Sequence, residues 1–489
     1  MSPPRPHFLV LTFPLQGHIT PALRLARRLL AASPDALVTF STTAAAHRRM
    51  FPPPETTKPQ DDGRLELLPF SDGTEGGFVR SSDPQAFNGY MASFHAAGAR
   101  SVGELLVALA ARGRAVTRVV YTLLLPWAAD VARDRGLHSA LYWIQPAAVF
   151  AVYHHYFRGG HAAAAAIVQH GHDPSFLVRL PGLPPLALRD LPSFLTESTD
   201  PSDQFHSVYT AIRDLFDFDP LDDKDAPKAT VLVNTCQELE AGALAAMAEE
   251  YDMLPVGPLL PTSSGDDEAG LFKQDEDARY MEWLDGKPAN SVVYVAFGSL
   301  ARMEREQLDE LLRGLEESGR PYLCVVRKDV KAELLNPEGT TSAGETDAGD
   351  KDGMVVEWCD QVRVLSHPAV GCFVTHCGWN STLESVACGV PMVCVPRLSD
   401  QRMNAWLVER EWRVGARAEV GGDGVLRAAE LRRRVEEVMR EEEAVRRRAA
   451  AGEWKRAVAD ALGNGGSSDR NLTAFVRGGG VSVGTGLQA

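Results

Sequence analysis

Residues 358–401 read WCDQVRVLSHPAVGCFVTHCGWNSTLESVACGVPMVCVPRLSDQ. Within them, the apolar run at 370–375 predicts a buried strand, which a turn and a helix would follow. We expect that helix to begin near Ser381 and to end at Gly389, because Ser381 and Glu384 have the spacing of a capping box. The start of such a helix has unpaired backbone N–H groups and a positive dipole end, so it is suited to bind a diphosphate. Any α/β protein can cap a helix in this way, so the pattern alone leaves a purely structural role open.

On both sides of this stretch, short β-branched runs alternate with longer amphipathic segments. The first series of runs lies at 7–12, 36–40, 118–124, 139–144 and 230–234, and the second lies at 291–297, 321–326, 354–357, 370–375 and 391–395. Such alternation is typical of doubly wound parallel sheets with helices on both faces. The sequence therefore predicts the α/β class.

A segment rich in Pro, Gly and acidic residues, 256–268, separates the two series and predicts a linker. The 489 residues also exceed the roughly 250–300 residues at which a single hydrophobic core stops growing. We expect an N-terminal domain over 1–257 and a C-terminal domain over 258–466. A helix over 467–477 is expected to cross back to the first domain, and 478–489 to form a flexible tail.

Composition narrows the possible partners and the compartment. The formal net charge is -15, from 50 basic and 65 acidic residues, which disfavours binding to nucleic acid or to a membrane surface. The seven cysteines are odd in number and lie mostly in apolar runs, which favours reduced thiols. We find neither a signal peptide nor the roughly 20 apolar residues that a membrane span needs. We therefore expect a cytoplasmic monomer.

The stretch at 358–401 resembles the signature box of plant secondary-product UDP-glycosyltransferases, from its opening Trp to its closing Asp-Gln. FPLQGHITP at 13–21 and FGS at 297–299 are also similar to that family, so the resemblance covers nearly the whole chain. It implies a GT-B fold of two facing Rossmann-like domains, with the UDP-sugar bound mainly by the second and a small acceptor molecule by the first. It also implies an inverting transfer that needs neither a metal nor another cofactor.

The resemblance further implies which residues bind the donor. Trp358 would stack on uracil, and Gln361 and Glu384 would bond to the ribose hydroxyls. The remaining donor-binding positions are Cys359, next to Trp358 in the sequence, then Ser299, His376, Asn380 and Ser381 at the diphosphate, and Trp379, Asp400 and Gln401 at the sugar. In that family, a closing Gln such as Gln401 is associated with glucose.

His18 matches the general base of that family in position and in its flanking residues. We expect it in the turn before a helix whose first turn holds Pro21, where the helix dipole would help to keep the imidazole neutral. The family usually has an Asp near residue 120 that bonds to the base in the manner of a triad, and here Thr122 takes its place. Thr122 could orient His18 but cannot stabilise an imidazolium by charge. Asp130 is expected to be a surface residue.

The acceptor is expected to be a flat, apolar metabolite such as a phenolic, a flavonoid or an aromatic acid, glucosylated on a hydroxyl or a carboxylate. Candidate acceptor-binding residues are Phe78, Trp143, Gln145, Phe150, His154 and Phe194. Several of these could equally belong to the core. Because Thr122 replaces the family Asp, a UDP-sugar-binding protein with weak or no catalysis stays open as an alternative.

Other site types fit the sequence less well. Three Asp-x-Asp pairs, beginning at residues 217, 275 and 350, lie in acidic loops and are expected to be solvated. A zinc site is disfavoured because no C-x-x-C pair is present. The chain also lacks the G-x-S-x-G of a serine hydrolase and a G-x-G-x-x-G after its first strand.

Overall fold

The computed structural model describes residues 5–50, 63–74, 76–79, 81, 83, 85–217, 228–261, 279–298, 304–326 and 352–478. The chain divides into unit 1, Met1–Phe272 with Asp460–Ala489, and unit 2, Lys273–Ala459. Leu259 is bonded inside unit 1, since its N–H donates to Asn234 Oδ1 at 2.9 Å and its carbonyl accepts from Arg24 at 3.1 Å. Unit 1 therefore continues beyond the expected boundary near residue 258. The expected tail lies outside the described residues, except for Gly478.

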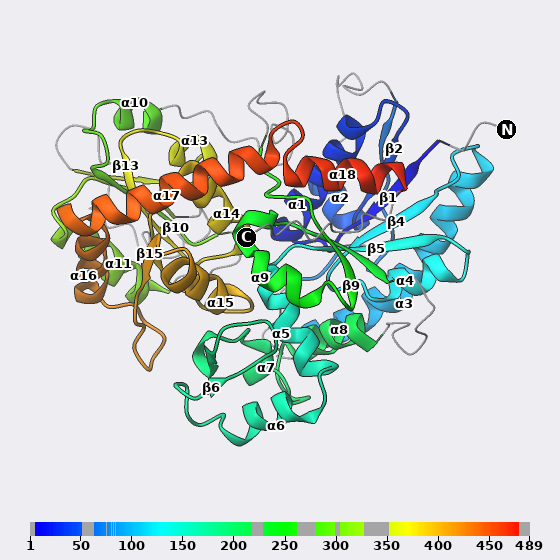
Figure 1. Ribbon diagram of the computed structural model, residues 1–489, viewed down its shortest axis with the longest axis horizontal. Coiled ribbons are helices and arrows are strands. Elements are labelled where there is room, and N and C mark those ends of the chain that lie inside the picture. Colours follow the sequence, from blue (N-terminus) through cyan, green and yellow to red (C-terminus); the bar gives the residue numbers. More distant parts are fainter. Residues whose placement is uncertain are drawn as a thin grey trace, which may run out of the picture. The chain divides into compact units, whose positions relative to one another are not determined.

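Unit 1 is built on a seven-stranded parallel sheet in the order β3-β2-β1-β4-β5-β8-β9 (Figure 1). The strands are β1 (His7–Leu11), β2 (Leu37–Ser41), β3 (Leu65–Leu67), β4 (Arg118–Thr122), β5 (His138–Trp143), β8 (Ala229–Val233) and β9 (Tyr251–Pro255). Every residue of β1 is buried, as expected for a strand whose sheet is covered on both faces.

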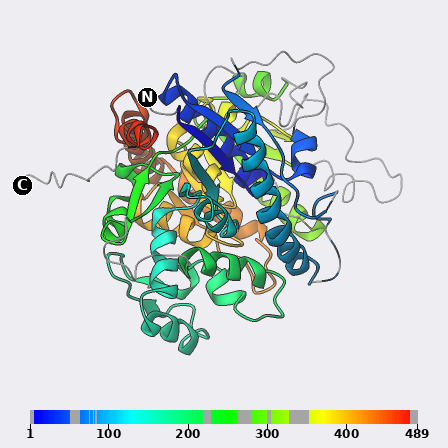
Figure 2. The same cartoon turned by 90° about the vertical axis from the view of Figure 1, so that its right-hand side faces the viewer.

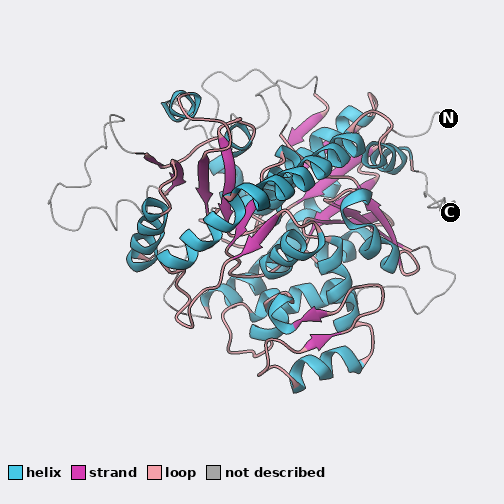
Figure 3. Ribbon diagram, turned by 60° about the vertical axis from the view of Figure 1, so that its left-hand side comes forward, coloured by secondary structure: helices cyan, strands magenta, loops and turns pink. Residues whose placement is uncertain are grey.

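Helices lie on both sides of this sheet, and Figure 2 shows them from a second direction. They are α1 (Gln16–Ala32), α2 (Ala44–Met50), α3 (Ala86–Ala111), α4 (Trp127–Arg133), α5 (Ala147–Phe157), α6 (His161–Gln169), α7 (Phe194–Glu197), α8 (His206–Asp217), α9 (Gln237–Met247) and α18 (Ser467–Arg477), with a 3₁₀ turn at Leu188–Asp190. A separate antiparallel pair consists of β6 (Leu177–Val178) and β7 (Leu186–Ala187) (Figure 3).

Unit 2 repeats the plan with six parallel strands in the order β12-β11-β10-β13-β14-β15. The strands are β10 (Val292–Ala296), β11 (Tyr322–Val325), β12 (Gly353–Val356), β13 (Val370–Thr375), β14 (Met392–Cys394) and β15 (Gly415–Arg417). The helices are α10 (Arg279–Asp285), α11 (Arg305–Glu317), α13 (Gln361–Leu365), α14 (Trp379–Cys388), α15 (Gln401–Trp406), the π-helix Leu407–Glu411, α16 (Ala428–Met439) and α17 (Glu441–Leu462). Side chains from the central strands pack on α11 and α16 to form one hydrophobic core.

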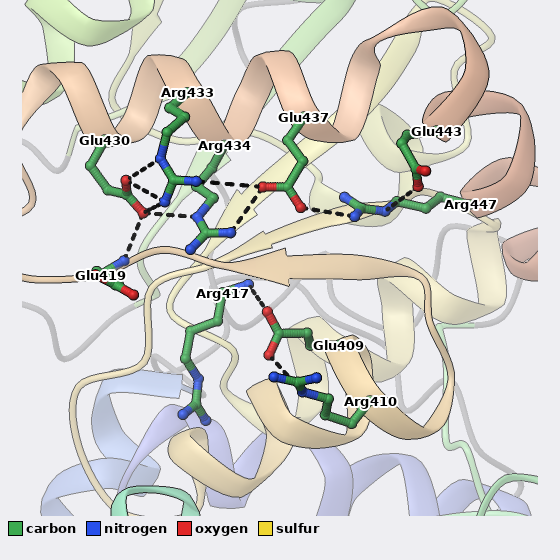
Figure 4. Close-up of polar contacts among 10 residues, drawn as sticks. All are labelled: Glu409, Arg410, Arg417, Glu419, Glu430, Arg433, Arg434, Glu437, Glu443 and Arg447. Atoms are coloured by element: carbon green, nitrogen blue, oxygen red, sulfur yellow. Dashed lines mark hydrogen bonds and ion pairs between the residues drawn. The ribbon is translucent and has the colours of Figure 1, made fainter. Parts of the chain in front are cut away.

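An ion-pair network joins α16 to the start of α17 inside unit 2 (Figure 4). Glu437 accepts from Arg434 at 2.9 Å and from Arg447 at 3.0 Å, and Glu430 accepts from Arg434 at 2.8 Å. The side chains of Arg434 and Arg447 are each only 14% exposed, so these pairs are less screened than isolated surface pairs. The network holds the first turns of α17 against α16.

The chain then returns to unit 1 through α18, which packs against α1 and β9. Ser468 Oγ donates to the carbonyl of Gly257 at 2.6 Å, and Asn471 Nδ2 donates to that of Pro255 at 2.9 Å. The guanidinium of Arg118 lies 4.6 Å from the centre of the Phe475 ring. None of the described helices is both long and apolar enough to cross a membrane.

Candidate active site

In each sheet, some of the candidate residues follow the two neighbouring strands at which the strand order reverses. The chain leaves β1 toward β2 and β3 on one side and resumes at β4 on the other, and in unit 2 the same reversal lies between β10 and β13. Open α/β sheets bind ligands at the carboxyl ends of the strands at this point. His18 and Thr122 lie there in unit 1, and His376 lies there in unit 2.

His18 lies inside a helix, which corrects the expectation that it precedes one. Helix α1 begins at Gln16, so His18 is its third residue and Pro21 lies in its second turn. Among the described residues, the buried Nδ1 atom of His18 has no hydrogen-bond partner. Burial lowers the pKa of His18 to about 4, so the imidazole is neutral at physiological pH and can accept a proton.

Thr122 does not bond to His18 within the described part of the chain. It is fully buried at the end of β4, where its Oγ1 accepts from the N–H of Phe13 and donates to Thr12 Oγ1, each at 3.4 Å. Its hydroxyl therefore links the ends of β1 and β4. The expectation that Thr122 orients the imidazole directly finds no support in this geometry. Asp130 lies on the surface, paired with Arg133.

His376, one of the diphosphate candidates, follows β13 directly. A Cβ atom added to Gly298 would lie 2.7 Å from the imidazole, and one added to Gly378 would lie 2.5 Å from its Nε2. Only glycine fits at these two positions, so the backbone approaches the ring closely from both. Burial, followed by the charge of Arg397, lowers the pKa of His376 to about 4. A neutral histidine there can donate one N–H to a phosphate.

A second cluster forms where α13 meets α14. Gln361 Nε2 donates to Glu384 Oε2 at 2.7 Å and to Ser381 Oγ at 3.0 Å, while Gln361 Oε1 accepts from the Tyr294 hydroxyl at 3.3 Å. Three residues assigned separately to the donor are thus in direct contact. Tyr294 was not anticipated, because it lies within the apolar run of β10 and gives no signal in the sequence.

The start of α14 differs from the capping box expected at Ser381. The helix begins at Trp379, its N-cap is Gly378 without a side-chain cap bond, and Ser381 accepts from Gln361 instead. The expected end is correct, since Gly389 takes a left-handed conformation with φ 75° at the C-cap. The capping-box prediction is wrong because the helix already begins two residues before Ser381, with Gly378 as its N-cap.

The sugar candidates follow β14. Gln401 Oε1 accepts from the backbone N–H groups of Arg397 and Leu398, at 2.9 and 3.1 Å, which directs its amide nitrogen away from them. Asp400 Oδ2 accepts from Asn404 Nδ2 at 2.7 Å, and burial raises the pKa of this carboxyl to about 6. Each of the two side chains is therefore fixed before any sugar binds.

The other described donor candidates follow strands β12 and β13 of the same sheet. Trp358 is half-buried just beyond β12, and the Cys359 thiol after it lies 3.4 Å from the Tyr294 hydroxyl. Trp379 is buried, with its ring centre 6.0 Å from that of Trp412. Asn380 is the second residue of α14. Ser299 lies outside the described residues.

The acceptor candidates divide into two sets. Trp143, Phe150 and His154 are buried, with the Trp143 and Phe150 rings 5.3 Å apart and His154 Nδ1 bonded to the Tyr251 hydroxyl at 3.1 Å. This packing favours the core interpretation that the sequence left open. Gln145 is also buried, at the turn into α5.

Phe78 and Phe194 belong to a series of contacting aromatic rings that also reaches His18. Phe78 is 38% exposed, with ring centres 5.2 Å from Phe87 and 5.3 Å from Tyr90. Phe194 reaches Phe87 through Phe205, at 6.1 and 6.2 Å. Tyr90 continues through Phe94 and Phe13 to the imidazole of His18, with ring centres 6.0, 5.1 and 5.5 Å apart.

A cavity of about 300 Å³ opens beside this series of aromatic rings in unit 1. Its apolar lining includes Met91, Phe94, Leu124 and Trp127, and its polar lining includes Gln85, Asn88, His95, His206 and Asp214. Phe94 both lines the cavity and belongs to the series of aromatic rings that reaches His18. A flat molecule with an oxygen substituent suits such a lining.

Three or more His, Cys, Asp or Glu side chains gathered as for a metal ion are not found among the described residues.

Comparison with known proteins gives concordant matches. The family profile described as "UDP-glucoronosyl and UDP-glucosyl transferase" matches residues 247–447. Crocetin glucosyltransferase of Gardenia jasminoides is 41% identical over 99% of this chain and 98% of its own length, and anthocyanidin 3-O-glucoside 5-O-glucosyltransferase 1 of Perilla frutescens is 40% identical over 96% and 98%. The crystal structure of Os79 from O. sativa in complex with UDP is similar with a TM-score of 0.79, at 31% identity over 96% and 99% of the two chains.

Proposed function

The chain belongs to the plant UDP-glycosyltransferase family, and on that premise we propose that it transfers glucose from UDP-glucose to a hydroxyl or carboxylate of a small aromatic or apolar metabolite. Its two sheets with their helices are the Rossmann-like halves of the GT-B fold. The observation that carries the proposal is the contact of Gln361 with Ser381 and Glu384. The same unit contains His376, whose ring is closely approached by Gly298 and Gly378. These groups suit a ribose and a diphosphate.

For the donor, Trp358 stacks on uracil and Glu384 accepts from the ribose hydroxyls, with Gln361 beside it. His376 and the first N–H groups of α14, joined by Asn380, Ser381 and Ser299, hold the diphosphate. Trp379, Asp400 and Gln401 contact the sugar. Since the oxygen of Gln401 is already occupied, its NH₂ group is left to donate to a sugar hydroxyl.

For the reaction, an acceptor oxygen attacks the anomeric carbon from the face opposite to UDP. A new carbon–oxygen bond forms while the bond to the β-phosphate breaks, and its electron pair leaves with UDP. A hydroxyl acceptor transfers its proton to the neutral imidazole of His18, whereas a carboxylate has none to give. One displacement turns an α-linked donor into a β-linked product.

For the acceptor, the cavity beside Phe94 is the site that we propose. It lies within unit 1, and the ring of Phe13 contacts both Phe94 of its lining and His18. The two relatives are about equally similar to this chain and are named for different compounds, so the resemblance does not select one acceptor.

The test is turnover of UDP-glucose with a panel of phenolics, plant hormones and carboxylic acids, with NMR of the product. We expect a β-linked product, unchanged rates with EDTA, and a preference for UDP-glucose over UDP-galactose that Gln401→His weakens. An α-linked product would contradict inversion, and loss of activity with EDTA would contradict metal independence.

A binding protein with weak or no catalysis is the second candidate, because Thr122 leaves His18 without the usual acidic partner. Tight UDP binding without turnover on any acceptor would favour it.

A further inference from the structure

Arg397 lies in the loop between β14 and α15, and its guanidinium is held by a buried side chain. Arg397 Nη2 donates to Gln307 Oε1 at 2.8 Å. Gln307 is itself fixed by the backbone of Leu426, since its Oε1 accepts from the Leu426 N–H at 2.9 Å and its Nε2 donates to the carbonyl at 3.1 Å. The guanidinium of Arg397 is therefore held in place against α11.

The strand order brings this cation to the diphosphate candidates. Strand β13 lies between β10 and β14. Arg397 follows β14, whereas Gln307 lies in α11, which follows β10, so the side chain crosses the carboxyl end of β13. His376 lies at that end. The electrostatic effect agrees, because the Arg397 charge is the second cause, after burial, that lowers the pKa of His376.

The guanidinium also has donors available for a ligand. Arginine carries five N–H donors, and in the described part of the chain only Nη2 of Arg397 is engaged. The residue is exposed, and among the described residues its guanidinium hydrogen-bonds with Gln307 alone. Glu384 and Asp400, which are assigned to the donor, are acids, and His376 is neutral. Arg397 is therefore the cation that the described part of this site offers.

We propose that Arg397 donates to the β-phosphate of the UDP-sugar and stabilises the negative charge that UDP gains as it leaves. This inference rests on the proposed transferase function. The bond from the anomeric carbon to the β-phosphate oxygen breaks with its electrons passing to that oxygen, and a fixed guanidinium beside it favours this separation of charge. Arg397 thus adds a fixed positive charge to the helix dipole of α14 and the neutral donors around it.

The test compares three substitutions. Arg397→Gln removes the charge but keeps an amide that can still donate to Gln307, and Arg397→Lys keeps a charge without the planar fork. Arg427→Gln is the matched control, because Arg427 is exposed on the same unit and pairs with Glu306 and Asp423. Calorimetry gives the affinity for uridine, UMP and UDP, and steady-state kinetics give kcat with UDP-glucose.

We expect Arg397→Gln to weaken UDP binding and to lower kcat by about 10- to 100-fold each, the range for a hydrogen bond to a charged group. Uridine and UMP should bind within about twofold of the unmodified protein, since they lack the β-phosphate. The UDP affinity and kcat of Arg397→Lys should lie between those of the unmodified protein and those of Arg397→Gln. Arg427→Gln should change neither quantity.

Equal losses for uridine and UDP would show that Arg397 only holds the Gln401 loop and would overturn the inference, as would unchanged UDP affinity and kcat. If Arg397→Gln does not fold, the ratio of UDP to uridine affinity in Arg397→Lys decides, and an unchanged ratio overturns the inference. An unmodified protein that binds no UDP would overturn the proposed function as well.

Discussion

Within the described part of the chain, Nδ1 of His18 has no hydrogen-bond partner, and burial lowers the pKa of the imidazole to about 4. Because the pKa is depressed, the base is already unprotonated above about pH 5, so kcat on a phenolic acceptor should show no loss that titrates near the ordinary histidine pKa of about 6.5. His18→Ala should lower kcat on that acceptor by about 10²- to 10⁴-fold with little change in UDP affinity. The measurement is kcat against pH from 4.5 to 9, with His138→Ala, an exposed histidine at the start of β5, as a comparison. A rate that falls tenfold between pH 7 and 6 would contradict this assignment.

Thr122 leads to a second prediction about the acceptor class. Its hydroxyl bonds to Phe13 and Thr12, so nothing with a negative charge stabilises an imidazolium at His18 from this position. Carboxylates, with pKa values near 4–5, are already nucleophilic at neutral pH, whereas a phenol near 10 needs the base. We expect Thr122→Asp to raise kcat more for a phenol than for an acid, and His18→Ala to harm the acid less.

Thr122→Ser is the matched control for this prediction, since it keeps the hydroxyl and should leave both rates near their starting values. Equal effects of Thr122→Asp on the acid and the phenol would count against a preference for ionised acceptors.

Single residues also show what the sequence can and cannot reveal about contacts. Gln361, Ser381 and Glu384 were assigned from a spaced pattern, and the structure brings them together. Arg397 and Gln307 were missed, because their contact joins elements 90 positions apart and neither residue type marks it locally. The aromatic residues Trp143 and Phe150 could not be separated from core residues in advance, because burial of a helix or strand end depends on what packs over it.

At the scale of elements, Glu240 stabilises the start of a helix from a distant position. Its carboxylate accepts from the N–H groups of Ala147 and Ala148, each at 3.0 Å, at the first turn of α5. The side chain is buried, which raises its pKa to about 6. Glu240→Ala should lower the free energy of unfolding by about 1–3 kcal/mol, the cost of leaving buried donors unpaired.

Urea unfolding at pH 7.5 measures this loss, with the exposed Glu249→Ala as the control. The direction in which stability changes with pH follows from the pKa of Glu240. With a raised pKa, the folded protein binds more protons than the unfolded one between about pH 4.5 and 6, so the Glu240 contribution weakens stability as pH rises through that window. Glu240→Gln should remove that slope, and an unchanged slope would contradict the assignment.

Element boundaries were less predictable than element existence. The alternating runs predicted the strands of both sheets except β3, β9 and β15. Helix α14 begins two residues before its expected start at Ser381, and α1 begins at Gln16, so that His18 lies inside it rather than before it. In α14 the Ser381 hydroxyl of the first turn accepts from Gln361, and the N-cap Gly378 makes no side-chain cap bond. Turn chemistry read from neighbouring residues cannot reveal such long-range bonds.

At the scale of the whole molecule, the chain forms unit 1 from two separate segments, and α18 closes it. The Phe475 ring is buried, with its centre 5.7 Å from that of Phe8 in β1, and Arg118 at the start of β4 covers it. Phe475 of the last helix thus contacts residues of β1 and β4 that lie more than 350 positions earlier in the chain. Thr122 lies at the other end of β4, and α1, which contains His18, follows β1. Loss of the last helix should weaken unit 1 while leaving the core of unit 2 intact.

Phe475→Ala should therefore lower the stability of unit 1 by about 3 kcal/mol, as for a large buried ring replaced by a methyl group. Thermal unfolding with and without UDP distinguishes the units, because a ligand raises the transition only of the unit that binds it. We expect an early transition that UDP does not shift and a later one that it does, whereas Arg477→Ala, an exposed change in the same helix, should leave the unfolding curve unaltered. If Phe475→Ala instead lowers a single transition that UDP raises as a whole, the two units unfold together, and α18 stabilises the molecule rather than unit 1 alone.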